Sequence, residues 1–537
     1  MPPRFRRPDL MTFELVPDDE REDDADLVPD DPEPGQARRR LADLRDRAVA
    51  RWRALSRGGR VAVAASTAAV VVAAATAGFA PGLLDARAER LRAEAVHGLP
   101  GAVGDLSEPL TERWELTDGT DELTTLAGGL VLTTQGTDAV ATDAGTGREA
   151  WRHDVGPYPT CGPQGSFRGD ASTPATVAVC LSGAADDRRV TVLDADGAVL
   201  GERPLGPARS DAYDEAAPPD APVVVPAAGG ALAVAEGVTD ATAPWPPDGV
   251  PDADTLRRLR ADGWVDPTLR VEDALTGEVR GEATLRLRPE DLEQCGMMQD
   301  GGAEPEVMIN PAVGASPTDV TMSVCSTSVL MTPGGTVIDA ATDGWTQPLP
   351  GGRHVVVSDQ KSTVLDDDGT VVATVPGWLV PPAVDDDPDG SFLVLPDLGQ
   401  AVGQLQLRAI GADGAERWHA PLDDIGGVLA RVAGVVVVQD GGELVGLDAA
   451  TGAEIWARDD LLRRTADGSG DWLVGAVTDG TRLLVGISGD GDRRRLVALD
   501  LRDGATAWDR QERGYLGQLQ SVGGHVVAVD DTVHGLG

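Results

Sequence analysis

One short frame of residues recurs along this chain, and the recurrence constrains its fold more than any other feature. In each clear copy an apolar run leads to an Asp, a Gly follows four residues later, and a Trp stands four residues beyond the Gly. Weaker copies at 192–201, 271–281 and 364–372 keep the apolar run, the Asp and the Gly but lack the Trp. Such repetition is typical of one supersecondary unit copied many times. The clear copies place the repeat positions at Asp143, Gly147, Trp151, Asp448, Gly452, Trp456, Asp500, Gly504 and Trp508.

Each copy predicts a β-hairpin. Around residues 444–448 apolar side chains recur with a period of two, as a half-buried strand requires. The Asp accepts hydrogen bonds from turn N–H groups and the Gly adopts a positive φ at little cost, so the pair favours a tight turn. Further apolar stretches lie between the copies, for example at 435–438 and 483–486. Four short antiparallel strands per repeat predict a β-propeller blade, with the Trp filling the wedge between neighbouring blades.

The repeat resembles the blade of the pyrroloquinoline-quinone-type (PQQ-like) propeller, whose signature is Ala-x-Asp-x-x-Thr-Gly-x-x-x-Trp. Residues 141–151 match it at every fixed position, 446–456 and 498–508 match it well, and the other copies match in part. The family contains quinone-dependent dehydrogenases and non-catalytic relatives such as the propeller lipoprotein of the outer-membrane β-barrel assembly machinery. The resemblance implies the fold, whereas function depends on the sites that a fold carries.

The copies predict an all-β propeller of about eight four-stranded blades. Turn glycines mark eight candidate hairpins, but Gly344 and Gly369 lie only 25 residues apart, so seven blades also fit. Residues 110–116 add an outer strand with no hairpin before it, and residues 525–534 supply inner strands without an outer one. We therefore expect the two ends to complete one blade together, which closes the ring and removes its open edges. Nine blades fit if every marker counts.

The segment before the propeller predicts one transmembrane helix. Residues 61–80 are uncharged and long enough to cross a bilayer as a helix. Residues 36–60 hold nine Arg and two Asp, whereas residues 81–100 carry no net charge. By the positive-inside rule the N-terminus stays in the cytoplasm and the propeller lies outside the cytoplasmic membrane. A cleaved signal peptide, with its cleavage site at 75–77, is the alternative, but the long preceding region favours an uncleaved anchor.

The other N-terminal regions complete the expected domain organisation. Residues 1–35 are acidic and Pro-rich, a composition that predicts a disordered cytoplasmic tail. Residues 36–60 predict a basic juxtamembrane helix, either amphipathic against the inner leaflet or an ordinary Arg-rich flank. Residues 81–108 are expected to form a linker, and residues 109–537 the extracytoplasmic propeller.

The charge of the chain excludes some partners. The formal net charge is −42, and nearly all of it lies beyond residue 100. Such a field repels nucleic acid, anionic lipid and anionic wall polymers, so we expect no nucleic-acid partner. Cationic partners and divalent ions remain compatible with it. A coding bias toward acidic residues, or solubility alone, is the alternative explanation.

Four cysteines follow the predicted span, on the oxidising side of the membrane. Cys161 and Cys180 form one candidate pair and Cys295 and Cys325 the other, because each pair begins with Cys-Gly and ends in an apolar stretch. We predict two disulfides, Cys161–Cys180 and Cys295–Cys325, each joining adjacent strands of one blade, although three pairings are formally possible. The wide spacing disfavours a metal site.

No catalytic constellation emerges from the residues. The dehydrogenase resemblance would imply a Ca²⁺ site with Glu, Asn and Asp ligands, a catalytic Asp and a disulfide between adjacent cysteines. No two cysteines are adjacent here, and the single Asn, Asn310, lies in an insertion. The six His residues lack metal-ligand spacing, and no nucleophile-elbow, zinc-protease or phosphate-loop motif occurs. We therefore expect neither enzyme activity nor a cofactor.

One acidic turn has the spacing of a calcium loop. Asp385, Asp387 and Asp389, followed by Gly390, match the first positions of such a loop, but Pro396 stands where the bidentate Glu belongs. An acidic turn between strands is the preferred interpretation, and Ca²⁺ binding is the weaker alternative.

Two long insertions give the better indication of function. Residues 237–266 interrupt one blade between its second and third strands and contain a predicted helix over 253–261, and residues 286–318 lie between blades. In propellers both kinds of loop emerge on the same face, so the insertions are expected to gather at one mouth of the channel. Trp245 and Trp264 are candidate anchors for a partner there. The alternative is an insertion packed on itself.

These observations predict a membrane-anchored, extracytoplasmic scaffold that binds or assembles a protein or a cell-envelope component. One alternative is an exported quinone-dependent dehydrogenase-like enzyme, which would reduce a dye in the presence of Ca²⁺ and the quinone. Another is a transmembrane sensor that reports through the predicted helix to the acidic tail.

Overall fold

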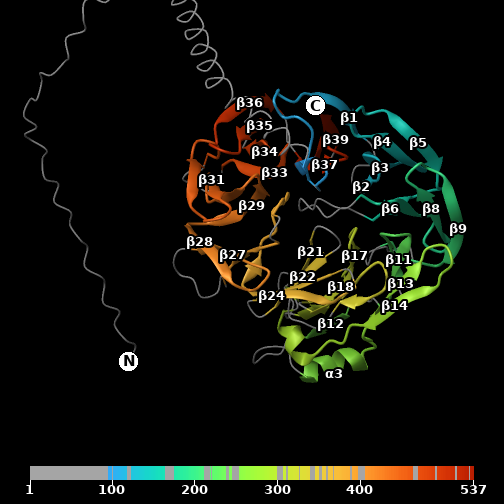
Figure 1. Cartoon of the computed structure of the whole chain (residues 1–537). Coiled ribbons are helices and arrows are strands. Elements are labelled where there is room, and N and C mark those ends of the chain that lie inside the picture. Colours follow the sequence, from blue (N-terminus) through green and yellow to red (C-terminus); the bar gives the residue numbers. More distant parts are fainter. Residues whose placement is uncertain are drawn as a thin grey trace, which may run out of the picture. The chain divides into compact units, whose positions relative to one another are not determined.

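The computed structural model contains nine four-stranded antiparallel sheets, arranged as the blades of a β-propeller (Figure 1). The described residues all lie in the unit formed by residues 86–537. The structure describes residues 95–537 except for 100, 118–122, 164–173, 211–217, 219–220, 238–240, 245–252, 295, 299–305, 310–311, 326, 339–344, 350–352, 359–360, 367, 388–389, 397–404, 464–469, 490–492, 514–516 and 531.

In blades 1 to 8 the strands run in chain order from the inside of the ring to the rim. Blades 1 and 2 comprise β2 (Thr124–Leu126), β3 (Leu130–Gln135), β4 (Asp138–Asp143) and β5 (Glu149–Asp154), then β6 (Thr160–Gly162), β7 (Val177–Ser182), β8 (Arg188–Asp194) and β9 (Val199–Gly206). Blades 3 and 4 comprise β10 (Val223–Ala227), β11 (Ala231–Glu236), β13 (Thr268–Asp273) and β14 (Val279–Thr284), then β17 (Ala312–Ala315), β18 (Val320–Val324), β19 (Thr327–Met331) and β20 (Val337–Ile338).

The second half of the ring follows the same order. Blades 5 and 6 comprise β21 (Trp345–Leu349), β22 (Arg353–Ser358), β23 (Lys361–Leu365) and β24 (Val371–Pro376), then β25 (Trp378–Leu379), β26 (Phe392–Leu395), β27 (Leu405–Ile410) and β28 (Glu416–Leu422). Blades 7 and 8 comprise β29 (Ile425–Val432), β30 (Val435–Asp440), β31 (Glu443–Asp448) and β32 (Glu454–Arg458), then β33 (Trp472–Thr478), β34 (Arg482–Gly489), β35 (Arg493–Asp500) and β36 (Thr506–Arg513). Blade 9 comprises β37 (Gln518–Val522), β38 (His525–Val529), β39 (Val533–Leu536) and β1 (Glu112–Leu116).

The repeat Asp and Gly build the turn before the outer strand, as expected. In blade 1 the Asp143 carboxylate accepts hydrogen bonds from the backbone N–H and the hydroxyl of Thr146, at 2.8 and 2.6 Å. Gly147 has φ 70° and donates its N–H to the Asp143 carbonyl at 2.8 Å. Asp448 and Thr451 repeat these bonds in blade 7. A side chain with a Cβ is strained at this positive φ, so the recurring Gly has a local backbone reason.

Where a blade carries the repeat Trp, this residue joins the blade to the segment packed beside it. The Trp456 indole donates to the Leu501 carbonyl of blade 8 at 2.9 Å, and a Cβ placed on Gly504 would lie 2.7 Å from its ring. The expected wedge role of the Trp is thus confirmed. The same indole-to-carbonyl bond joins Trp114 to Ala144, Trp151 to Ala195, Trp418 to Ala449 and Trp508 to Leu106.

The blade count is nine, not the eight we expected. The outer hairpin of blade 4 turns at Gly335, which has φ 90°, and Thr332 stands where most of the other repeats have Asp. Because this hairpin lacks both the Asp and the Trp, the frame did not reveal it. Gly344, which we took as a turn marker, lies outside the described residues.

The two ends of the described chain close the ring together, as predicted. β1 pairs with β39 in antiparallel register, with Trp114 opposite Gly535. Thr111 and Gly537 exchange backbone hydrogen bonds of 3.2 and 2.9 Å just beyond this pair. The edge of blade 9 is therefore covered by a strand from the other end of the chain.

Residues 95–99 and 101–110 belong to the propeller, which corrects the expectation of a linker over 81–108. Val96, Val103 and Leu106 are buried among apolar side chains of blades 7 to 9. Leu106 donates its N–H to the Asp479 carboxylate at 2.9 Å, and its carbonyl accepts the bond from Trp508. In the other blades with the repeat Trp, the acceptor of the indole bond lies in the hairpin of the next blade. Blade 9 has no hairpin before its outer strand, so this segment supplies the carbonyl that accepts the bond from Trp508.

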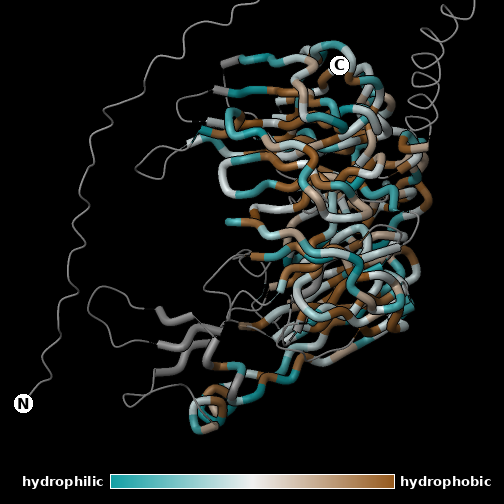
Figure 2. The backbone as a smooth tube through the Cα atoms, turned by 60° about the vertical axis from the view of Figure 1, so that its left-hand side comes forward, coloured by the Kyte–Doolittle hydropathy of each residue, from teal (hydrophilic) through white to brown (hydrophobic). Residues whose placement is uncertain are grey.

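Apolar side chains within and between the blades form the core. Viewed edge-on, hydrophobic stretches run through the strands, and hydrophilic stretches cluster toward the turns (Figure 2). None of the helices among the described residues is long and apolar enough to cross a membrane. The expected tail, juxtamembrane helix and span, at 1–35, 36–60 and 61–80, lie outside the described residues.

Candidate functional site

The two long insertions join in one structure, as expected, and their position at one mouth of the channel stays a prediction. β12 (Ala241–Pro244) comes from the insertion inside blade 3, whereas β15 (Gly296–Met298) and β16 (Glu306–Ile309) come from the segment between blades 3 and 4. β16 pairs with β12 on one side and with β15 on the other. We call β12, β15, β16, the helix α3 and the short helix η1 the insertion layer.

Helix α3 (Ala253–Ala261) covers this layer, in agreement with the predicted bounds. Leu256 and Leu259 are buried on one side of it, at the spacing of a helical turn. The helix ends at Ala261, Gly263 follows with φ 106°, and the Trp264 backbone N–H donates back to the Leu259 carbonyl at 3.0 Å.

The turn η1 (Pro289–Gln294) carries a buried carboxylate. Burial would raise the pKa of Asp291, but hydrogen bonds from the side chain and backbone of Arg288 lower it below its usual value. The guanidinium of Arg288 lies 2.8 Å from the carboxylate. The Arg288 guanidinium thus compensates the negative charge of the buried Asp291 carboxylate inside the layer.

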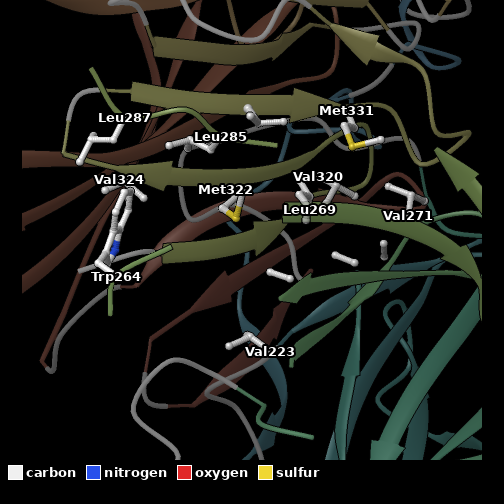
Figure 3. Close-up of a cluster of buried hydrophobic side chains, with 14 of the residues drawn as sticks. Val223, Trp264, Leu269, Val271, Leu285, Leu287, Val320, Met322, Val324 and Met331 are labelled. Carbon is white, nitrogen blue, oxygen red and sulfur yellow. The ribbon is translucent and has the colours of Figure 1, made fainter. Parts of the chain in front are cut away.

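Trp264 is part of the core and not a surface anchor, which corrects our expectation for this residue. Its side chain is only 3% exposed and lies beside Val324, close to Leu285 and Leu287 (Figure 3). The ring thus packs into the apolar cluster that blades 3 and 4 share. Trp245 lies outside the described residues, so its role as an anchor stays a prediction.

The solvent face of α3 is charged. Arg257, Arg258 and Arg260 are exposed, as is Asp262. Arg260 lies 3.2 Å from Asp266, across the end of the helix. A partner that docks on this helix therefore meets paired charges of both signs.

The acidic turn before β26 contains an internal cation. Arg431, from β29 of the next blade, donates to the Asp385 carboxylate at 2.7 Å and lies 2.9 Å from the Asp387 carboxylate. It also donates to the hydroxyl and carbonyl of Ser391, at 2.8 and 2.9 Å. The side chain of Arg431 is 7% exposed, so its buried guanidinium pairs with the carboxylates that a calcium ion would need as ligands. Asp389 lies outside the described residues.

A cavity of about 240 Å³ opens beside this turn, between blades 6 and 7. Asp386, Arg417, Trp418 and Arg431 contribute to its lining. Burial raises the pKa of Asp386, although its carboxylate accepts the Ala433 N–H at 2.8 Å. Among the described residues, no group of three or more His, Cys, Asp or Glu side chains is placed to hold a metal ion.

One predicted disulfide is present. Cys161 and Cys180 are directly opposite on β6 and β7 of blade 2, with an S–S distance of 2.01 Å. Cys325, which follows β18, is also disulfide-bonded. Cys295 lies outside the described residues, immediately before β15, so the Cys295–Cys325 pair stays a prediction. That pair would tie the insertion layer to blade 4 and not join two strands of one blade.

Sequence reasoning missed the internal arginines. Arg431 stands alone in the apolar run 428–432, and a lone cation in a buried strand signals a carboxylate partner elsewhere in the fold. Arg203 of blade 2 donates to the Ala274 carbonyl of blade 3 at 3.0 Å, the kind of bond that the repeat Trp makes in other blades. Nothing in the repeat frame marks either residue.

The comparisons with known proteins agree with the repeat. A family model described as outer membrane protein assembly factor BamB matches residues 404–535, which include the copies at 446–456 and 498–508, and confirms the PQQ-like repeat there. No curated protein matches the chain.

Two solved structures illustrate the likeness. BamB from Moraxella catarrhalis is 16% identical, with 80% of this chain and 98% of that chain covered and a TM-score of 0.37. A quinohemoprotein alcohol dehydrogenase from Comamonas testosteroni is 13% identical, with 83% and 84% covered and a TM-score of 0.30. At these values neither likeness indicates which activity the chain has.

Proposed function

We propose that this chain is a non-catalytic scaffold of the cell envelope that binds a protein or envelope component on its insertion layer. The observation that carries the proposal is the sheet formed by β12, β15 and β16, because two separate insertions build one added surface on a propeller that is already closed. Loops added to a rigid fold commonly carry its function. Arg431 supports the non-catalytic part, since it occupies the acidic turn that offered the one spacing suited to Ca²⁺.

The proposal includes an extracytoplasmic location, with residues 61–80 as the membrane anchor. The Cys161–Cys180 disulfide supports it, because structural disulfides persist in oxidising compartments. Alkaline phosphatase fused after Gly537 should be active if this location is right. Activity only of a cytosolic reporter fused at the same point would contradict it.

Photo-crosslinking tests the scaffold role in cells that make the full chain. A benzophenone amino acid replaces the exposed Arg257 of α3, and a matched control replaces the exposed Asp503 in the outer turn of blade 8. We expect one discrete adduct from position 257, identified by mass spectrometry as an envelope component, and none from position 503. Equal adducts from both positions, or none from 257, would argue against the insertion layer. Dye reduction after adding pyrroloquinoline quinone and Ca²⁺ would overturn the non-catalytic part.

A further inference from the structure

The outer strands of blades 2 to 5 begin with an exposed Val at one shared ladder position. Val199, Val279, Val337 and Val371 are the first residues of β9, β14, β20 and β24. Their side chains are 40, 48, 40 and 59% exposed. Leu200 and Val372, the next residues of β9 and β24, are likewise exposed.

The other five blades carry a polar residue at the same position. Blade 8 has Thr506 there, and the remaining four have Glu112, Glu149, Glu416 and Glu454. Single exposed apolar residues are ordinary on protein surfaces. Four consecutive blades with Val where the others have Glu or Thr form a regional feature of this rim.

The same four blades lack the repeat Trp, and their outer strands approach one another closely. Gly201 and Gly281 occupy the Trp position of blades 2 and 3. A Cβ on Gly281 would lie 1.9 Å from the Gly335 carbonyl oxygen of blade 4, and a Cβ on Gly201 would lie 2.9 Å from Leu275 of blade 3. Without an indole between them, the turn of the following blade lies directly against the outer strand of the blade before it. We call the row formed by Val199, Leu200, Val279, Val337, Val371 and Val372 the rim belt.

Carboxylates lie beside the rim belt, and in blades 2 and 3 they lie on both sides of it. Asp196, Glu278 and Asp368 are exposed in the turns before it, and Glu202 and Glu282 are exposed farther along β9 and β14. The arginines of these two strands point the other way: Arg203 donates to the Ala274 carbonyl, and Arg280 donates to the Pro333 carbonyl at 3.2 Å. Arg189, on β8, lies 3.7 Å from Glu202. In blades 2 and 3 the belt is thus an apolar row between two acidic borders.

We propose that the rim belt docks a cationic amphipathic helix of a partner protein. An apolar stripe with basic residues on both flanks is the complement of an apolar row between two carboxylate borders. The acidic borders disfavour an anionic bilayer and a second copy of this chain, because like charges would face each other. This inference rests on the proposed scaffold role but concerns the rim and not the insertion layer.

A designed peptide tests the chemistry. The probe is a labelled 18-residue helix with a Leu stripe flanked by Lys, and the comparison peptides replace Lys by Glu or Leu by Ser. Fluorescence anisotropy is measured with the full chain in zwitterionic nanodiscs, with empty nanodiscs as the blank. We expect the Leu/Lys peptide to bind at least tenfold more tightly than either comparison peptide.

Variants place the peptide on the belt. Replacing Val199, Val279, Val337 and Val371 by Thr, the residue that blade 8 has at this position, should weaken binding at least tenfold with an unchanged melting temperature. The matched control replaces exposed apolar residues outside the belt, Val265→Thr and Ile455→Thr, and should change the affinity less than twofold. Glu278→Lys with Glu282→Lys should weaken the Leu/Lys peptide and strengthen the Leu/Glu peptide.

Several results would overturn the proposal. One is equal binding of the Leu/Lys peptide to the wild-type chain and to the Thr variant. Another is equal binding of the Leu/Lys peptide and of the comparison peptide in which Ser replaces Leu. Self-association in sedimentation velocity that the Thr variant abolishes would identify the belt as a contact between copies instead. Deleting residues 241–261 removes the surface used by the scaffold proposal and should leave peptide binding intact, so the two proposals fail separately.

Discussion

At the residue scale, single side chains join neighbouring blades. Arg431 of blade 7 holds the acidic turn of blade 6 through two carboxylates and Ser391. Such buried charges matter mainly through the penalty of leaving one partner alone, because an unpaired buried carboxylate loses its hydration without compensation. The effect of substitution therefore depends on which partner is removed.

Replacing Arg431 tests this asymmetry. Arg431→Met should lower the free energy of unfolding by about 3–5 kcal/mol, because Asp385 and Asp387 lose their buried cation. Ca²⁺ should recover part of the loss in this variant and leave the wild-type melting temperature unchanged. Arg431→Lys is the control, since it keeps the positive charge but not the planar guanidinium. Its stability should lie between those of the wild type and the Met variant. Thermal unfolding with and without Ca²⁺ measures all three; a Met variant as stable as the wild type would refute the role of Arg431.

Asp386, in the same turn, should respond in the opposite direction. Burial raises the pKa of Asp386 above its value in the unfolded chain, so its ionisation disfavours the folded state. The penalty is absent below the unfolded pKa and complete above the folded pKa. Asp386→Asn keeps an oxygen that accepts the Ala433 N–H and should raise the melting temperature at pH 7 but not near pH 3. A variant less stable than the wild type at pH 7 would contradict this cause.

At the element scale, the outer hairpin is the unit that the sequence specifies. Asp143 and Gly147 close a turn through local bonds, so the frame predicted it without any knowledge of neighbouring blades. The repeat frame did not identify the hairpin of blade 4, because Thr332 and Gly335 form a turn of similar shape without the Asp and the Trp. Turn chemistry admits several solutions, and a frame based on one of them undercounts the others.

The Trp-to-Gly contact between blades gives a prediction for blades 7 and 8. Trp456→Phe should cost about 1 kcal/mol through the lost bond to the Leu501 carbonyl, and Trp456→Ala about 3–5 kcal/mol through the cavity that it leaves. Gly504→Ala should destabilise the fold more than Gly414→Ala. Both glycines have positive φ, 66° and 76°, but only Gly504 faces an indole, and nothing lies within 4 Å of a Cβ at Gly414. Denaturant unfolding measures the four variants; equal costs at the two glycines would show that backbone strain alone decides.

At the scale of the whole molecule, closure depends on pairing the two ends of residues 95–537. β1 covers the edge of β39, and residues 95–99 and 101–110 pack over blades 7 to 9. A propeller without its closing strand exposes a sheet edge that invites association with other chains.

Truncation separates these two contributions. A chain that begins at residue 95 should unfold like the full chain, because the described contacts are retained. A chain that begins at residue 111 should melt at a lower temperature. The truncation removes the carbonyl that accepts the Trp508 bond, and it also removes the buried side chain of Leu106. A chain that begins at residue 118 lacks β1 and should also self-associate. Thermal unfolding and sedimentation velocity record the series; a monomeric, equally stable chain from residue 118 would exclude the closing role of β1.

The sequence by itself determined what depends on neighbouring residues: the alternating strands, the Asp–Gly turns, helix α3 and the two positions where insertions leave the blades. Only the tertiary structure decided the ninth blade, the burial of Trp264, the pairing of Arg431 with Asp385, and the apolar row on the rim of blades 2 to 5. The physical reason is the distance along the chain between the residues that make each contact. Turns and strand periodicity arise from contacts within a few residues, whereas the surroundings of a side chain depend on which blade packs against it, and that is set by closing the whole ring.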